Sequence, residues 1–404
     1  MLTILHPEVL SLVHDIPVGL LPLWSHGEDV PKLVIKAPKE IILAAKMNQG
    51  FSIYAVPVCI QSQDTVGLIS AFFDDEDEPL IISTPMFDEP DSKTLRDILL
   101  SVRLDVYFFD VNNRELLGYR ATIECGADTR SFIEKTKFLP FNISSAKLSL
   151  HYMGEWFGRR NEKDDMSAMR IKFDSALFTE DLFIQDVRPE NHSYHGSGLF
   201  SHSLLERDEP GPFQERDIVQ LLHKIFLPEQ IYLGPLRVTD REEITDIMVV
   251  TNSNILFIQA KDSPNTEHVA RNTITRKKTT AIKSLKKAVS QTKGALRYAQ
   301  SKVPMQLISG NKEVEIILEG RAVRSLVIVK ELFSDEYSDY SDLVLPMAKD
   351  TQVPCIPLDY TELHMYTSNL REEDDFFSAY DRVFTHGVES GMFPRLRFGL
   401  TESN

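Results

Sequence analysis

The sequence predicts a β-rich α+β domain followed by an α/β domain, and two observations lead to this prediction. Residues 1 to 200 contain short apolar runs, such as FSIYAVPVCI and RLDVYFFDV, that are separated by Asp, Asn, Gly and Pro. Such runs are typical of strands joined by turns. Beyond residue 205 the pattern changes to helix, three strands, long helix and strand. The polar stretch ENHSYHGSGLFSHSLLERDEPGP lies between the halves, so we expect domains over residues 1–205 and 206–404.

The elements of the second domain follow from hydrophobic periodicity. A long helix over 279–302 has apolar or small residues at alternating steps of three and four, from Ile282 to Ala299, which predicts one buried stripe. The predicted segments in chain order are a helix in PFQERDIVQLLHKIF, strands in IYLGPLRV, EITDIMVVT and NILFIQAK, the long helix, strands in SLVIVKE and VPCIPLD, and a helix in REEDDFFSAYDRVF.

Composition predicts a globular protein of the cytoplasm. The chain has 404 residues, 42% of them apolar, which is enough for two or three domain cores. Its cysteines, Cys59, Cys125 and Cys355, lie far apart, so neither a disulfide framework nor a zinc ribbon is expected. The N-terminal segment has no early basic cluster, and no apolar run approaches the roughly 18 residues of a membrane span. We therefore expect neither a signal peptide nor a membrane partner.

Positive charge is concentrated in one segment of an acidic chain. The net charge is -16, yet residues 271–302 hold ten Lys or Arg and no Asp or Glu. At 100° per residue, one flank of the long helix collects Lys283, Lys286, Lys287, Lys293 and Arg297. Such a flank is either a phosphate-facing patch or a solvated helix face, and the sequence leaves both interpretations open.

Three polar residues interrupt the apolar strands of the predicted hairpin. Asp246 lies in the segment EITDIMVVT, and Gln259 and Lys261 lie two apart in NILFIQAK, so these two share a face of the sheet. Burying an unpaired carboxylate and an ammonium costs several kcal/mol, so the pattern indicates a partner or a metal ion. The alternative is a hairpin with one solvent-facing side. The same alternation of faces places Glu243 opposite to Asp246.

The element order and these residues resemble the PD-(D/E)XK nuclease superfamily, and Gln259-Ala260-Lys261 is similar to the Gln-x-Lys variant of Mrr-type endonucleases. The resemblance covers only the C-terminal half and implies a restriction-endonuclease-like core. It implies that Asp246, the Gln259 side chain and the Ala260 backbone carbonyl bind Mg²⁺ or Mn²⁺. Lys261 would position the attacking water or stabilise charge on the phosphorane. Because Gln259 replaces an acidic ligand, metal affinity should be weakened.

Glu215 is a further candidate in the first helix of this half. It shares a helix face with Ile218 and Leu222, which indicates that it points toward the sheet. The superfamily often uses a helix glutamate as an additional metal ligand. The alternative, which the sequence favours slightly, is that Glu215 only stabilises the helix N-terminus.

The resemblance predicts a metal-dependent endonuclease that cleaves DNA, and defence against foreign DNA is a role suggested by family analogy alone. The N-terminal domain would then recognise a target, a protein partner or an activating signal, and a homo-oligomer would place two active sites together. Two alternatives stay open. The first is an inactive nuclease-fold module that binds nucleic acid or a protein, and the second is a structural subunit whose basic flank is buried against an acidic partner.

Overall fold

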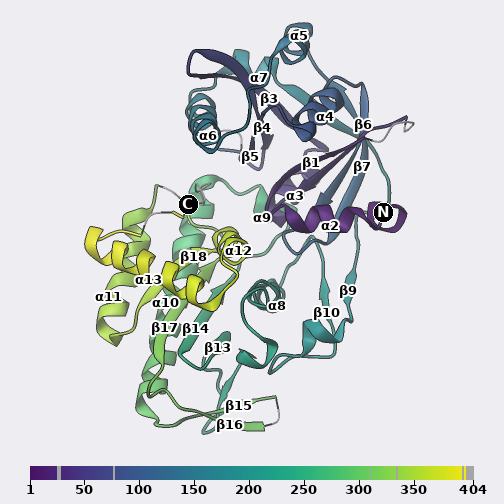
Figure 1. The fold of residues 1–404 in the computed structure, drawn as a ribbon. Helices are drawn as coiled ribbons and strands as arrows, with labels where there is room; N and C mark the ends of the chain where they lie inside the picture. Colours follow the sequence, from purple (N-terminus) through teal and green to yellow (C-terminus); the bar gives the residue numbers. More distant parts are fainter. Residues whose placement is uncertain (25–28, 76–77, 311, 334, 394, 397–404) are drawn as a thin grey trace.

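Two mixed β-sheets with helices on their faces form the protein in a computed structural model (Figure 1). The structure describes residues 1–404 except 25–28, 76–77, 311, 334, 394 and 397–404. One large sheet lies before residue 205 and the other after it. The exact domain boundary stays a prediction, and residues 1–205 and 206–404 are called the N-terminal and the C-terminal part below.

The N-terminal part is built on an eight-stranded sheet with the order β1-β2-β6-β7-β8-β3-β4-β5, so the predicted strand-rich character is confirmed. The pair β2 and β6 is parallel and the other pairs are antiparallel. Its strands are β1 (Gly19–Leu23), β2 (Lys32–Lys36), β3 (Gly50–Ile60), β4 (Gln63–Phe72), β5 (Leu80–Pro85), β6 (Arg103–Phe109), β7 (Glu115–Glu124) and β8 (Met169–Ala176). A separate hairpin-like pair follows in β9 (Ile184–Asp186) and β10 (Ser201–Ser203).

Helices cover both faces of this sheet, because successive side chains of its strands point to opposite faces and both faces are apolar. The helices α3, α4 and α5 pack into the core on one side, and α1, α2 and α6 pack on the other. The helices are α1 (Leu2–Leu5), α2 (Val9–Asp15), α3 (Lys39–Met47), α4 (Pro90–Leu99), α5 (Ala127–Lys135), α6 (Ile143–Gly158) and α7 (Glu162–Ser167), with a 3-10 turn η1 (Pro189–His192).

The C-terminal part is built on a five-stranded sheet with the order β11-β13-β14-β17-β18. The strands β13 and β14 are antiparallel, whereas β14, β17 and β18 run parallel. Its strands are β11 (Ile231–Leu233), β13 (Ile247–Val250), β14 (Asn254–Lys261), β17 (Ala322–Val329) and β18 (Cys355–Asp359). Its helical segments are α8 (Gly211–Leu222), η2 (Pro228–Gln230), α9 (Glu267–Ala270), α10 (Ile274–Ser301), α11 (Tyr337–Thr351), α12 (Tyr360–Asn369) and α13 (Glu373–Ser390).

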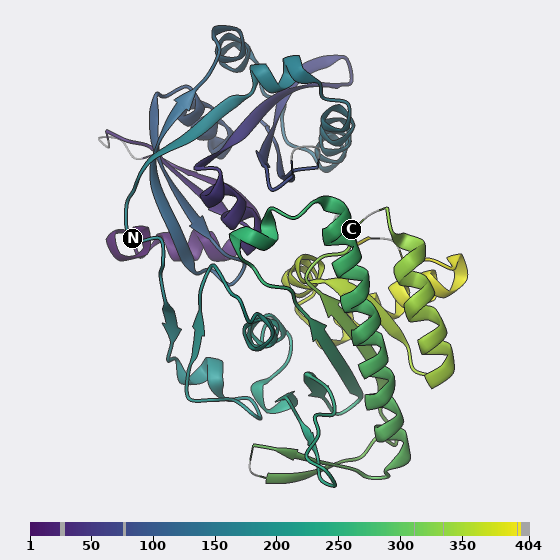
Figure 2. The same ribbon diagram turned by 180° about the vertical axis from the view of Figure 1, so that it is seen from behind.

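The long helix α10 packs along β14 and β17, and α11 packs beside it on the same side of the sheet (Figure 2). The predicted stripe is confirmed between Leu285 and Ala299, because its residues in this range are buried. Ile282, the first residue of the predicted stripe, is half-buried. The helix begins at Ile274, five residues before the predicted start. The predicted order of helix, strands, helix and strand is therefore found in an α/β arrangement.

One predicted strand is wrong in its extent. The segment IYLGPLRV splits into β11 and a short β12 (Leu236–Arg237), because Gly234 takes a left-handed conformation with φ of 54° and Pro235 follows it. The strand β12 joins β15 (Met305–Ser309) and β16 (Lys312–Ile316) in a small sheet that was not predicted from the sequence.

The parallel strands β14 and β17 end where the C-terminal part meets the N-terminal part (Figure 1). Lys330, which follows β17, pairs with Glu40 of the N-terminal part, and Asn265, which lies beyond β14, donates to the Leu205 carbonyl. In open sheets of parallel strands, ligand sites lie at the carboxyl ends of the strands. Across the part of the chain that the structure describes, every helix is too short or too polar to cross a membrane.

Candidate active site

Asp246 and Gln259 lie at the open end of the hairpin. Ile247 pairs with Ile258 at the end of the ladder, and Asp246 and Gln259 follow directly beyond this last pair. Gln259 and Lys261, two positions apart in β14, project to the same face of the sheet. Asp246 lies immediately before β13, which begins at Ile247, so its predicted position inside the strand is wrong by one residue. This offset of one position does not affect the predicted proximity of Asp246, Gln259 and Lys261.

Asp246 is held by contacts from the neighbouring strand. Its Oδ2 accepts a 2.6 Å hydrogen bond from the backbone N–H of Ala260 and lies 3.3 Å from Lys261 Nζ. Only 3% of Asp246 is exposed, whereas a fifth of the Lys261 side chain reaches solvent. A carboxylate and an ammonium therefore meet at the end of β14, with the ammonium at the accessible edge.

Gln259 is buried and lacks a hydrogen-bond partner for its side chain among the described residues. Only 3% of the residue is exposed. Neither amide atom of Gln259 is among the fully enclosed side-chain atoms that lack a partner in the described chain, so the amide retains some contact with solvent. An amide carbonyl that forms no hydrogen bond within the protein and is reachable from solvent can coordinate a cation through its oxygen.

Glu215 on α8 interacts electrostatically with this centre. Burial, followed by the charges of Asp246 and Glu243, raises the pKa of Glu215 to about 7, and Lys261 opposes this shift. Glu215 lies outside the first turn of α8, so the helix-stabilising interpretation of this residue is wrong. The electrostatic coupling with Asp246 and Lys261 favours the alternative, in which Glu215 belongs to the same centre.

Glu243 also belongs to this acidic group, contrary to the prediction from strand alternation. Burial and the Asp246 carboxylate raise the pKa of Glu243, and Lys261 opposes this shift. The residues between Glu243 and Asp246 do not form a regular strand, because Glu243 makes only an isolated bridge to Leu236 and the chain bends at Ile244 and Asp246. The two-residue period of a strand therefore does not apply to Glu243.

The available metal donors are few, and their chemistry is that of oxygen ligands. In the described ranges no group of three or more His, Cys, Asp or Glu side chains is arranged to hold a metal ion. A metal at the end of β14 would depend on the Asp246 carboxylate, the Gln259 amide and the Ala260 carbonyl, with Glu215 nearby. Carboxylate and amide oxygens are ligands that Mg²⁺ and Mn²⁺ accept, so the chemistry of these donors is compatible with the ions that the resemblance implies.

The basic flank of α10 is only partly neutralised. Lys283, Lys286 and Lys287 are exposed and form no ion pair with described residues. Lys293 and Arg297 share the carboxylate of Asp350 on α11, at 2.6 and 3.2 Å. The free cations of the helix are therefore concentrated in its middle.

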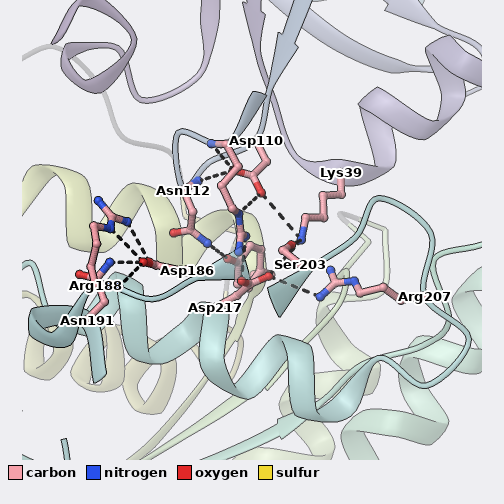
Figure 3. Close-up of polar contacts among 11 residues, drawn as sticks. Lys39, Asp110, Asn112, Asp186, Arg188, Asn191, Ser203, Arg207 and Asp217 are labelled. Atoms are coloured by element: carbon pink, nitrogen blue, oxygen red, sulfur yellow. Dashed lines mark hydrogen bonds and ion pairs between the residues drawn. The ribbon is translucent and has the colours of Figure 1, made fainter. Parts of the chain in front are cut away.

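A buried charge network attaches α8 to the N-terminal part (Figure 3). Asp217 is 5% exposed and lies on the opposite side of α8 from Glu215, two residues away. Its carboxylate contacts Arg114 at 2.8 Å, Lys39 at 3.3 Å and Arg207 at 3.4 Å. Although burial opposes ionisation, these three cations hold the pKa of Asp217 well below its ordinary value. The ion pairs of Asp217 thus attach to the N-terminal part the same helix that carries Glu215 on its opposite side.

Lys261 lines a cavity between the two parts of the chain. The cavity is bordered by β14 and β17, by the first turns of α10, and by residues of the N-terminal part such as Glu40 and Asp74. Glu331, which also lines it, has a pKa raised to about 7 by burial and by the charges of Glu40, Asp359 and Asp74, while Lys277 opposes the shift.

This shift gives a pH-dependent prediction for Glu331→Gln. The folded pKa of about 7 exceeds the ordinary 4.5, so ionisation disfavours the fold increasingly as pH rises from 4.5 to 7. At pH 8 the variant should be more stable than wild type by up to about 3 kcal/mol, and at pH 5 the difference should be small. Urea unfolding at both pH values measures this, with the exposed Glu124→Gln as control. Equal stabilities at pH 8 would contradict the prediction.

Comparisons with known proteins add no relative. No family model, no curated protein and no solved structure matches this chain. The functional assignment therefore depends on the geometry of the residues themselves.

Proposed function

We propose that this protein is a divalent-metal-dependent endonuclease that hydrolyses phosphodiester bonds in DNA, with a C-terminal part of the PD-(D/E)XK type. The observation that carries the proposal is the meeting of Asp246, the unpartnered Gln259 amide and Lys261 at the end of β14. Glu215 and the exposed lysines of α10 support it, because the first adds a carboxylate to the centre and the second offer contacts to a polyanion.

Each residue has a distinct role in this proposal. Asp246 and Gln259 hold the cation, and the hydrogen bond from Ala260 fixes the carboxylate of Asp246 in place. Bound Mg²⁺ or Mn²⁺ supplies a charge that polarises the phosphate and acidifies water. Lys261 donates a charge-assisted contact to the phosphate oxygens as their charge grows in the transition state. Glu215 accepts a proton from water or binds the metal through a carboxylate oxygen.

The second candidate function is a nuclease-fold module that binds nucleic acid or a protein without cleaving. The neutral Gln259 favours it, because a site with one carboxylate fewer holds a divalent cation more weakly. Metal binding separates the two candidates. An active nuclease binds Mg²⁺ or Mn²⁺ through Asp246, whereas the binding module shows no metal response.

A plasmid-nicking assay tests the proposal. Wild-type protein should nick supercoiled plasmid with Mg²⁺ or Mn²⁺ and not with EDTA, and the isosteric variant Asp246→Asn should lose this activity because it removes the charged ligand. Thermal melting of both proteins controls for folding. If wild type leaves plasmid intact with both metals, or if Asp246→Asn cleaves normally, the assignment of this centre is wrong.

Charge reversal on α10 tests the predicted DNA contact. The double variant Lys283→Glu with Lys287→Glu should bind duplex DNA more weakly, and the slope of log K against log salt should fall by about 2 because two phosphate contacts are lost. Fluorescence anisotropy across a salt series measures both quantities. The matched control reverses two exposed lysines of the N-terminal part, Lys147→Glu with Lys163→Glu. An equal effect in the control would show a general charge effect and no patch on α10.

A further inference from the structure

Two more lysines line the cavity that contains Lys261. Lys277 lies near the start of α10, and Lys330 follows β17 directly. Three elements of the C-terminal part thus bring three ammonium groups to one hollow at the ends of the parallel strands. Lysine ammonium groups are common ligands of phosphate oxygens, which they contact as point charges.

Two of these lysines form ion pairs with carboxylates of the N-terminal part. Asp74 Oδ2 lies 2.7 Å from Lys277 Nζ, and Glu40 Oε1 lies 3.6 Å from Lys330 Nζ. Lys330 Nζ also donates to the Pro264 carbonyl and to Asn265 Oδ1, both at 3.2 Å. The N-terminal part therefore places acidic groups on cations next to the candidate active site.

One carboxylate oxygen of the Asp74–Lys277 pair lacks a hydrogen-bond partner in the described chain. The two side chains are only 15% and 13% exposed. The other carboxylate oxygen of Asp74, Oδ1, is buried and has no hydrogen-bond partner in the described chain. A buried charged oxygen without a partner is costly, so this pair contributes less to folding than its 2.7 Å distance suggests.

We propose that Lys277 and Lys330 bind phosphate groups of the DNA substrate, and that Asp74 and Glu40 occupy these contacts while DNA is absent. The proposal rests on the nuclease function proposed above. A carboxylate and a phosphate compete for the same ammonium group, so DNA enters only when the two acidic side chains move away. The N-terminal part then acts as an internal competitor of the substrate.

Opposite effects of the two partners in one ion pair test this proposal. Asp74→Asn should tighten DNA binding about fivefold because it removes the competitor, whereas Lys277→Met should weaken binding about fivefold and reduce the salt slope by about 1. A purely structural pair would lower stability in both variants and shift affinity in one direction or not at all. Anisotropy of a short labelled duplex, recorded in EDTA with the full-length protein, measures the affinities.

The second pair, Glu40→Gln and Lys330→Met, provides the same comparison if a variant of the first pair fails to fold. The control variant Asp88→Asn breaks an ion pair inside the N-terminal part, between Asp88 and Lys93, and should leave affinity unchanged. Shifts of the same sign, or no shifts, in both pairs would overturn the proposal. Because binding is measured in EDTA, opposite shifts in a protein that never cleaves plasmid would support the phosphate site and reject only the nuclease function.

Discussion

Lys261→Met is expected to lower the rate of metal-dependent DNA cleavage by about 10²- to 10³-fold while DNA affinity changes little. The reason is that Lys261 lies at the end of β14 beside Asp246, with a fifth of its side chain exposed, and in the proposed mechanism it contacts a phosphate oxygen that gains charge during hydrolysis. Methionine keeps most of the side-chain volume and removes only the charge. A loss in kcat without a matching loss in affinity identifies an interaction made in the transition state.

The measurement is single-turnover cleavage of a labelled duplex, combined with anisotropy for binding. Lys302→Met is the matched control. Lys302 is exposed and directly follows the C-terminal end of α10, whereas Lys261 lies near the first turns of that helix. The control should cleave at the wild-type rate. Normal cleavage by Lys261→Met would exclude the residue from the reaction even if Asp246 proves essential.

Asp217→Asn is expected to lower the free energy of unfolding by about 3–5 kcal/mol. The change is isosteric but leaves Lys39, Arg114 and Arg207 buried beside a neutral group. Asp110 offers Arg114 and Lys39 one remaining carboxylate, at 2.7 and 3.7 Å. Lys39 and Arg114 would then share Asp110, and Arg207 would lose the ion pair that it forms with Asp217, so buried positive charge would be left poorly compensated.

Chemical denaturation, followed by circular dichroism, measures this loss. Asp208→Asn, an exposed change in the segment leading to α8, should alter stability by less than about 0.5 kcal/mol. The double variant Asp217→Asn with Arg114→Met should recover part of the loss, because it removes one uncompensated cation. If Asp217→Asn is as stable as wild type, the network contributes nothing net to folding.

Local patterns predicted the elements that have a regular period. The stripe of α10 follows from spacing alone, and the proximity of Gln259 and Lys261 follows from the alternation of a strand. The assignment of Glu243 failed because the rule of alternating faces does not hold across the bends at Ile244 and Asp246. Sequence periodicity describes a face only where the backbone is regular.

Long-range charge pairing was not predictable from the sequence. Asp217 contacts Lys39 and Arg114, which precede it by 178 and 103 residues. No local pattern marks these three residues as partners, because isolated charged residues are usually exposed. The same holds for Asp74 and Lys277, which lie 203 residues apart and meet only once both parts are folded.

The attachment of α8 by Asp217 also limits how the protein can be divided. A fragment beginning at residue 206 would keep Asp217 and Arg207 but lose Lys39 and Arg114. Asp217 would therefore keep one of the three cations that contact its carboxylate. The face of α8 opposite Glu215 would then keep only Arg207 from this network, while the apolar residues of the helix would stay in the C-terminal core. A fragment without the N-terminal part is therefore expected to hold α8 less firmly than the full chain, so a truncated protein is a poor substitute for the full chain in any assay of Glu215.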